Sequence, residues 1–389
     1  MQFNEIPPLK PLFCPLAFGE WQHRLSFVKF SLVILSLISF SSLQLWAQNL
    51  PLGLYEGFLG NNGIALSDST AASQYNPSLL RDRSDNSFSL GGNAFGALSS
   101  RQNGSEFSSL NLAPTYLSSV SNGTALVHEF FFTSLQSGPV QSETQSGNRI
   151  TEEDIVFNQA RFGYSMAFKS IPFALQFLGR YSQQRHLGFV EETDSTAGSF
   201  TSGKIESDNR YLGASLGISS HARFGVYSIG FNFLSRGLDL YKKSSGTLKT
   251  STYQNAGGTL THAETEFEAP PAPEQGHLLA IGHEFKTGDH QFLIDTTFAE
   301  DTGLNNAYSF RQGFGYKMNS RAGHQLMAGI NHLLGSQIHY FGQSLYSSVG
   351  YSWLTRTLRS SVGLYHYNSR IENQTTSSVG IAFASEFQY

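Results

Sequence analysis

A strict two-residue alternation is the feature that most limits how this chain can fold. Over residues 379–389, large apolar or aromatic side chains alternate with small or polar ones. Successive side chains of a β-strand point to opposite faces, so one face of this segment is apolar and the other is small and polar. The pattern recurs at 162–168, 310–318 and 345–353. In a water-soluble sandwich the apolar face would form the interior, whereas in an outer-membrane barrel it faces lipid and the small polar face lines the lumen.

Composition excludes several other classes of protein. Charged residues make up 14% of the chain and aromatic residues 13%, with 38 glycines, whereas an ordinary soluble domain has about a quarter charged residues. Beyond the N-terminus no apolar run reaches the ~18 residues of a spanning helix, and the aromatic content argues against disorder. A net charge of −4 without a basic stripe gives no electrostatic footprint for nucleic acid. These properties indicate a β-rich protein.

Fourteen alternating segments predict the strands of an all-β, transmembrane antiparallel β-barrel spanning residues 87–389. They lie near residues 87–98, 106–118, 123–134, 154–168, 172–184, 206–219, 222–236, 275–286, 289–299, 307–318, 322–332, 343–353, 357–367 and 375–389. A soluble sandwich also alternates, but these segments have about the 9–11 residues that a strand needs to cross a bilayer.

The connections between these segments alternate in length, which is typical of barrels with tight periplasmic turns and long outer loops. Tight links such as 220–221 and 287–288 are separated by long ones, which lie at 135–153, 185–205 and 237–274. Within the last of these we expect residues 251–267 to form an outlying hairpin.

Residues 1–47 have the character of an export signal. Lys29 precedes an uncharged apolar stretch, and Ala47 provides a small residue for cleavage. A single anchoring helix is the alternative, but the stretch is short and broken by serines. Because the first 27 residues are proline-rich, we expect the true start near residue 28. The single cysteine, Cys14, lies in this leader, so the mature chain would contain no disulfide and no thiolate metal site.

Residues 48–86 carry few strand signals and are predicted to form a plug, or hatch. The small residues of 65–73 permit close packing against a wall. Pro77 drives Asn76 out of the helical region. Alone, Asn76-Pro77 would be read as an ordinary turn into the first strand, and the preceding segment, with Asp68, favours the hatch.

Residues 57–80 resemble the start of the FadL/TodX family, outer-membrane transporters for long-chain fatty acids and other hydrophobic compounds. Asn76 and Pro77 match the Asn-Pro of the family, Asp68 matches its acidic position, and Ser78 replaces the commoner alanine. The resemblance implies a fourteen-stranded barrel with an N-terminal hatch inside it. It assigns hatch and gating roles to Asp68, Asn76, Pro77 and Ser78.

Nothing in the sequence predicts an enzyme, a metal site or a cofactor. The 12 histidines are scattered, without the spacing of metal ligands on one element. No nucleophile-elbow motif is present.

Four cations point into the predicted lumen and are candidate substrate-binding residues, namely Arg161, Arg180, Arg311 and Lys317. Arg161 and Arg180 lie on strands predicted to be neighbours. A buried charge needs a partner, and the candidates are Asp68 of the plug or a bound carboxylate, which arginine can grip with two parallel hydrogen bonds. Alternatively, the arginines bridge to carbonyl groups of the hatch.

Together these features predict a bacterial outer-membrane channel for passive uptake of hydrophobic small molecules such as long-chain fatty acids. The alternatives are a general diffusion porin and a structural or secretion-partner barrel. The expected partners are a hydrophobic ligand, membrane lipid with lipopolysaccharide, and the barrel-insertion machinery, which would recognise the aromatic end at Tyr389. We expect a monomer and no nucleic-acid partner.

Overall fold

The computed structural model describes residues 55–389 except 102–103, 147–148, 195–197, 255–257, 268–275, 302–306, 321–322, 336–342 and 372–373. The predicted leader and the predicted start near residue 28 lie outside the described residues. None of the helices in the described part is long and apolar enough to cross a membrane.

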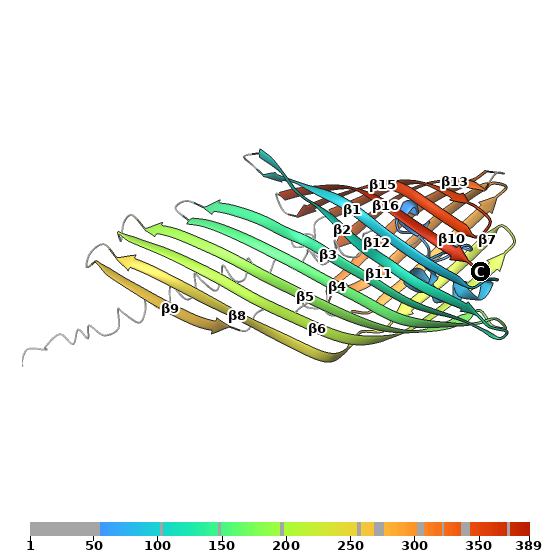
Figure 1. Cartoon of the computed structure of the whole chain (residues 1–389), viewed down its shortest axis with the longest axis horizontal. Coiled ribbons are helices and arrows are strands. Elements are labelled where there is room, and N and C mark those ends of the chain that lie inside the picture. Colours follow the sequence, from blue (N-terminus) through green and yellow to red (C-terminus); the bar gives the residue numbers. More distant parts are fainter. Residues whose placement is uncertain are drawn as a thin grey trace, which may run out of the picture. The chain divides into compact units, whose positions relative to one another are not determined.

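Among the described residues, sixteen strands follow three short helices (Figure 1). The helices are η2 (Glu56–Leu59), α3 (Ala72–Tyr75) and η3 (Pro77–Asp82). The strands are β1 (Ser87–Arg101), β2 (Gly104–Asn122), β3 (Leu126–Ser146), β4 (Arg149–Phe168), β5 (Phe173–Asp194), β6 (Ser199–Phe224), β7 (Tyr227–Leu234), β8 (Leu238–Gln254), β9 (Thr259–Phe267), β10 (Leu278–Thr287), β11 (His290–Asp301), β12 (Ala307–Asn319), β13 (His324–Gly335), β14 (Gln343–Leu354), β15 (Leu358–Ile371) and β16 (Gln374–Gln388).

Fourteen of these strands form a closed antiparallel ring. β1 to β7 and β10 to β16 pair in succession, with β1 joined to β16 and β7 joined to β10. β8 and β9 pair with each other as a hairpin, and β8 also pairs with residues 199–214 of β6. The predicted barrel and its strand number are therefore confirmed, and the hairpin expected at 251–267 is present as part of β8 and β9.

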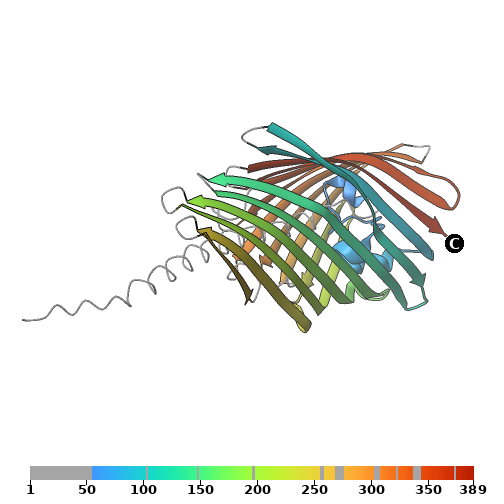
Figure 2. The same ribbon diagram turned by 60° about the vertical axis from the view of Figure 1, so that its left-hand side comes forward.

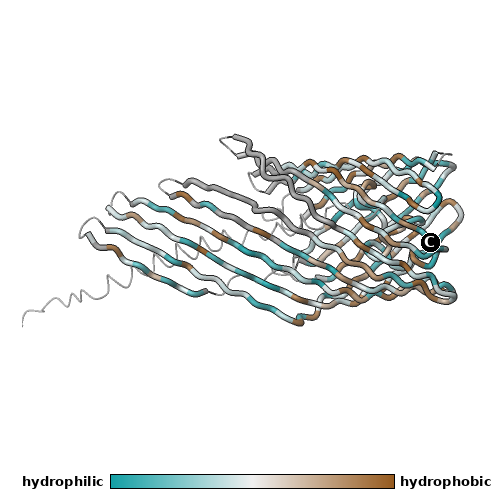
Figure 3. The backbone as a smooth tube through the Cα atoms, viewed as in Figure 1, coloured by the Kyte–Doolittle hydropathy of each residue, from teal (hydrophilic) through white to brown (hydrophobic). Residues whose placement is uncertain are grey.

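The apolar face of the alternation lies on the outside of the ring. In β16 the side chains of Val379, Ile381 and Phe383 are each at least 50% exposed, whereas the alternate residues Ala382 and Ala384 are buried. Figure 3 shows hydrophobic residues concentrated where all strands surround the lumen, and a mostly hydrophilic β8–β9 extension. An apolar exterior with a small, polar interior is the arrangement of a transmembrane barrel.

The three long links predicted as loops are largely strand, which corrects that expectation. β3 runs to Ser146 and β4 starts at Arg149, while β5 and β6 extend to Asp194 and from Ser199. Side chains beyond the membrane meet water on both faces, so the apolar alternation disappears from the sequence although the backbone pairing continues.

The tight turn predicted at residues 220–221 is also wrong, because β6 continues to Phe224. Ser219 and His221 are buried on the lumen side, so the alternation runs through them. The chain turns instead at Gly225, whose φ of +63° is a left-handed conformation that glycine adopts without steric cost.

The pairing of β2 with β3 is interrupted. It covers only residues 117–122 of β2 and 127–132 of β3, although both strands extend much further. In Figures 1 and 2 the β1–β2 hairpin diverges from β3 and β4 beyond this point. In the described part of the wall, β2 and β3 therefore do not pair before Leu117 of β2 or after Phe132 of β3.

The segment before β1 folds inside the ring as a plug, which Figure 2 shows as the three short helices within the barrel. Its apolar side chains Tyr55, Phe58 and Leu59 share one buried cluster with wall residues, among them Leu293 and Met327. The hydrophobic core of this protein thus lies between the plug and the wall.

Candidate functional site

The plug backbone rests directly on lumen-facing glycines of the wall. A Cβ atom added to Gly329 of β13 would lie 2.0 Å from the nitrogen of Gly60, and one added to Gly230 of β7 would lie 2.0 Å from the carbonyl oxygen of Ile64. Heavy atoms cannot approach so closely. The plug backbone can therefore lie this close to the wall only where the wall residue is glycine.

Hydrogen bonds from wall side chains fix the plug at these positions. The Asp295 carboxylate accepts from the backbone N–H groups of Gly63 at 2.6 Å and Ile64 at 2.9 Å. The Tyr346 hydroxyl donates to the carbonyl of Gly57 at 2.8 Å. Both wall groups are buried, where leaving a polar group unpaired is costly.

A buried carboxylate within the plug orders its central turn. Glu56 accepts from the Ser69 hydroxyl at 2.5 Å, from the N–H and hydroxyl of Thr70 at 2.7 and 3.1 Å, and from the N–H of Ala71 at 3.2 Å. Sequence reasoning did not single out Glu56 or Asp295. Asp295 could have been found as an acidic residue on the lumen face of an alternating strand.

The Asn-Pro-Ser motif anchors the plug to β6. Asn76 is extended, as expected before proline, and Pro77 begins η3. The Asn76 amide donates to the carbonyls of Ile64 at 2.7 Å and Ser220 at 3.1 Å, and its oxygen accepts from the hydroxyl of Ser78 at 2.6 Å. The Ser78 N–H also reaches the Ser219 hydroxyl, at 2.9 Å. All three residues of the motif are buried.

Lys317 pairs with the plug. Its Nζ lies 2.5 Å from Oδ2 of Asp68 and 4.4 Å from the ring centroid of Tyr55. Burial raises the pKa of Asp68, but the charge and hydrogen bond of Lys317, together with the charges of Arg359 and Lys286, outweigh it, so the pKa lies below its ordinary value. Lys317 therefore has Asp68 as its counter-ion, which was one of the two partners predicted for the lumen cations.

Arg161 and Arg180 are direct cross-strand partners on β4 and β5, but their surroundings differ. Arg180 is buried and its Nε donates to the Ser182 hydroxyl at 3.2 Å. With its amide oriented to present oxygen, Gln159 accepts from Arg180 at 2.7 Å. The wall thus satisfies Arg180.

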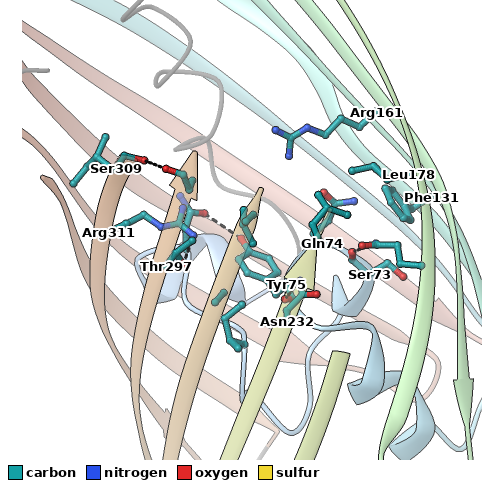
Figure 4. Close-up of a pocket in the computed structure, with 18 residues that line it drawn as sticks. Ser73, Gln74, Tyr75, Phe131, Arg161, Leu178, Asn232, Thr297, Ser309 and Arg311 are labelled. Atoms are coloured by element: carbon teal, nitrogen blue, oxygen red, sulfur yellow. Dashed lines mark hydrogen bonds between the residues drawn. The ribbon is translucent and has the colours of Figure 1, made fainter. Parts of the chain in front are cut away.

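A cavity of about 100 Å³ lies between the plug and the wall (Figure 4). The plug contributes Asn61, Ile64, Ser73, Gln74 and Tyr75, and the wall contributes Phe131, Arg161, Gln176, Leu178, Asn232, Leu234, Leu278, Ala280, Thr297, Ala299, Ser309, Arg311 and Leu333. Half of these lining residues are apolar or aromatic, and the other half are polar or charged. The cavity therefore offers both apolar contacts and hydrogen-bond donors to a small molecule.

Two guanidinium groups, those of Arg161 and Arg311, line this cavity. Nε of Arg161 is buried and makes no hydrogen bond among the described residues. Arg311 donates from Nη2 to the Thr297 hydroxyl at 3.3 Å, and no described acidic group forms an ion pair with either arginine. Both side chains are half-buried, and a bound carboxylate can accept charge-assisted hydrogen bonds from a guanidinium group.

Of the four predicted cations, the structure brings Arg161 and Arg311 to one cavity, and it places Arg180 and Lys317 outside its lining. Among the described residues, no group of three or more histidine, cysteine, aspartate or glutamate side chains could hold a metal ion.

No family model matches this chain, and no curated protein matches its sequence. Its fold is nevertheless similar to solved structures. The Pseudomonas putida toluene transporter TodX matches with a TM-score of 0.61 at 12% identity, covering 88% of this chain and 99% of that one. The Ralstonia pickettii toluene transporter TbuX gives 0.55 at 13% identity over 88% and 99%. A Pseudomonas aeruginosa FadL homologue gives 0.56 at 11% identity over 87% and 99%. The fold that the plug motif implied is confirmed.

Proposed function

We propose that this protein is a channel of the bacterial outer membrane through which hydrophobic small molecules are taken up passively. The observation that carries the proposal is the cavity between plug and wall, which combines apolar side chains with the guanidinium groups of Arg161 and Arg311, neither of which forms an ion pair with a described acidic group. The similarity in fold to TodX and to a FadL homologue supports it.

The cavity favours the carboxylate end of a ligand that also has an apolar body, such as a long-chain fatty acid, because about 100 Å³ holds only part of such a molecule. Leu178, Leu234 and Leu278 offer contacts to an alkyl chain, while the two arginines offer charge-assisted hydrogen bonds to the head. A neutral hydrocarbon would offer neither guanidinium group an anionic partner.

The route of the ligand follows from the position of the cavity. Phe131, which lines it, lies where the β2–β3 pairing ends, so the cavity adjoins the interrupted part of the wall. Release to the other side requires the plug to shift near Asn76 and Pro77. That shift breaks the hydrogen bonds of Asn76 with Ile64 and Ser220, so the exit is closed at rest.

Uptake by cells that lack and then regain the gene tests this proposal. Labelled oleate and labelled oleyl alcohol have the same chain but differ in the carboxylate. We expect Arg161→Gln combined with Arg311→Gln to reduce oleate uptake about tenfold or more and to leave oleyl alcohol uptake unchanged. Arg185→Gln is the matched control, because its side chain is exposed on the projecting part of β5.

Other outcomes would contradict the proposal. Equal uptake of both compounds with and without the gene would exclude this transport role. Steady ion conductance of the intact protein in planar bilayers would indicate a diffusion porin instead. A stable protein complex on purification, without any uptake defect, would indicate a structural or secretion-partner barrel.

The remaining partners follow from the outer-membrane location. Tyr389 is 66% exposed on the outer face, and its N–H donates to the carbonyl of Asn86 at 3.0 Å. An aromatic side chain at this end is therefore accessible to the barrel-insertion machinery, and lipopolysaccharide and phospholipid would surround a monomer.

A further inference from the structure

Four pairs of neighbouring strands carry the same histidine–tyrosine pair. In each pair, Nδ1 of the histidine lies within hydrogen-bond distance of the tyrosine hydroxyl. The pairs are His128–Tyr164 at 2.5 Å, His283–Tyr227 at 2.7 Å, His290–Tyr316 at 2.8 Å and His324–Tyr351 at 2.6 Å. In all four the rings are stacked.

The pairs also share one register. Tyr316 lies directly opposite Phe292, two residues beyond His290, so the histidine and the tyrosine meet diagonally across the strands. The same relation holds in the other three pairs, where the residue opposite the tyrosine is Phe130, Phe285 or Leu326. Repetition on strands that are far apart in the sequence indicates a common environment.

That environment is the outer surface at the tight-turn end of the barrel. Tyr227, His290 and His324 are the first residues of β7, β11 and β13. Each histidine shares its strand face with an exposed apolar residue; for His128 this is Phe130, which is 63% exposed. The pairs therefore lie at the edge of the apolar band, at the depth of lipid headgroups.

The chemistry of the pair leaves one donor for a ligand. When the tyrosine hydroxyl donates to Nδ1, the neutral imidazole carries its proton on Nε2. Nε2 makes no hydrogen bond in the described part of the chain in any of the four histidines. The strongest acceptors at headgroup depth are phosphate oxygens.

The surface is hollowed at the first of these pairs. Ser121, His128, Phe130 and Tyr164 line an open pocket on the outside of the barrel. The hydroxyl of Ser121 and the imidazole of His128 provide polar groups there, and Phe130 provides an apolar wall.

We propose that the four histidine–tyrosine pairs are binding sites for the headgroup phosphates of phospholipids in the leaflet at the tight-turn end. The tyrosine fixes the imidazole tautomer, Nε2–H donates to the phosphate, and the neighbouring apolar side chain contacts the upper acyl chain. This proposal requires a membrane-spanning barrel and is independent of what the channel transports.

Native mass spectrometry of the whole barrel in detergent with added phosphatidylglycerol tests it. We expect the wild type to retain phosphatidylglycerol but not diacylglycerol, which has the same chains without the phosphate. His→Phe at residues 128, 283, 290 and 324 together keeps the rings but removes the donors, and should lower the number of retained phospholipids several-fold. His262→Phe on β9, whose imidazole contacts Ser251 outside the barrel ring, should change nothing.

Heat-dependent mobility on a gel shows whether each variant has folded. If the fourfold variant does not fold, His290→Phe and His324→Phe alone should each remove about one bound phospholipid. Unchanged retention in folded variants, or equal retention of diacylglycerol, would overturn the proposal and leave the pairs as an aromatic belt. Competition by millimolar inorganic phosphate would overturn the assignment to lipid and indicate a site for free phosphate.

Discussion

Replacing Gly329 with alanine should displace the plug from the wall. The new Cβ would lie 2.0 Å from both the nitrogen of Gly60 and the carbonyl carbon of Leu59. Ordinary contact begins at 3.4 Å, so the plug backbone must retreat by about 1.4 Å. Both atoms belong to the backbone and cannot rotate away as a flexible side chain would.

That movement stretches two hydrogen bonds that hold Gly60. Its N–H donates to the Ser348 hydroxyl at 3.2 Å, and its carbonyl accepts from the Asn331 amide at 3.0 Å. A typical hydrogen bond contributes about 0.5–1.5 kcal/mol net. Loss of both hydrogen bonds therefore lowers the free energy that holds the plug against the wall by about 1–3 kcal/mol. This raises the population of the displaced plug by roughly 5- to 150-fold.

Single-channel recording in planar bilayers measures this population as the fraction of time the barrel conducts. Gly91→Ala is the matched control, because a Cβ at Gly91 makes only ordinary contacts, the nearest 3.5 Å away at Ala384. We expect frequent openings of Gly329→Ala and wild-type behaviour of Gly91→Ala. If Gly329→Ala stays as closed as the wild type, the wall glycines do not determine where the plug sits.

Three further perturbations test the plug. The stabilisation from Asp68 through Lys317 should be complete above the ordinary aspartate pKa of about 3.9 and should be lost as pH falls through its lowered pKa. The protection of plug amides, measured as hydrogen exchange relative to the intrinsic rate at each pH, should therefore fall below about pH 4 in the wild type, and an equal acid response of Lys317→Met would contradict this reasoning. Phe58→Ala empties the space against Gly350 and should weaken the plug by about 3–5 kcal/mol, seen as faster limited proteolysis; unchanged cleavage would refute it. Glu56→Gln removes a charged acceptor worth about 1.5–3 kcal/mol per bond, so the Thr70 amide should exchange at least about tenfold faster, and an unchanged rate would show that Glu56 does not order this turn.

The alternation of side chains is a local property, and it therefore determined much of the fold from the sequence alone. Which residues face lipid, as Val379 and Ile381 do, follows from the two-residue period of a strand. The extended conformation of Asn76 followed from Pro77 in the same way. The extensions of β3 to β6 could not be predicted by this means, because strands with water on both faces carry no apolar period.

Charge pairing across the lumen was decided by the tertiary structure. Lys317 and Asp68 are separated by 249 residues, and Arg161 and Arg180 both occupy lumen-facing positions, yet the wall satisfies Arg180 and leaves Nε of Arg161 free. The period of a strand places a side chain inside the barrel, but its partner depends on the registers of all intervening strands and on the path of the plug. Neither of these is written in the neighbouring sequence.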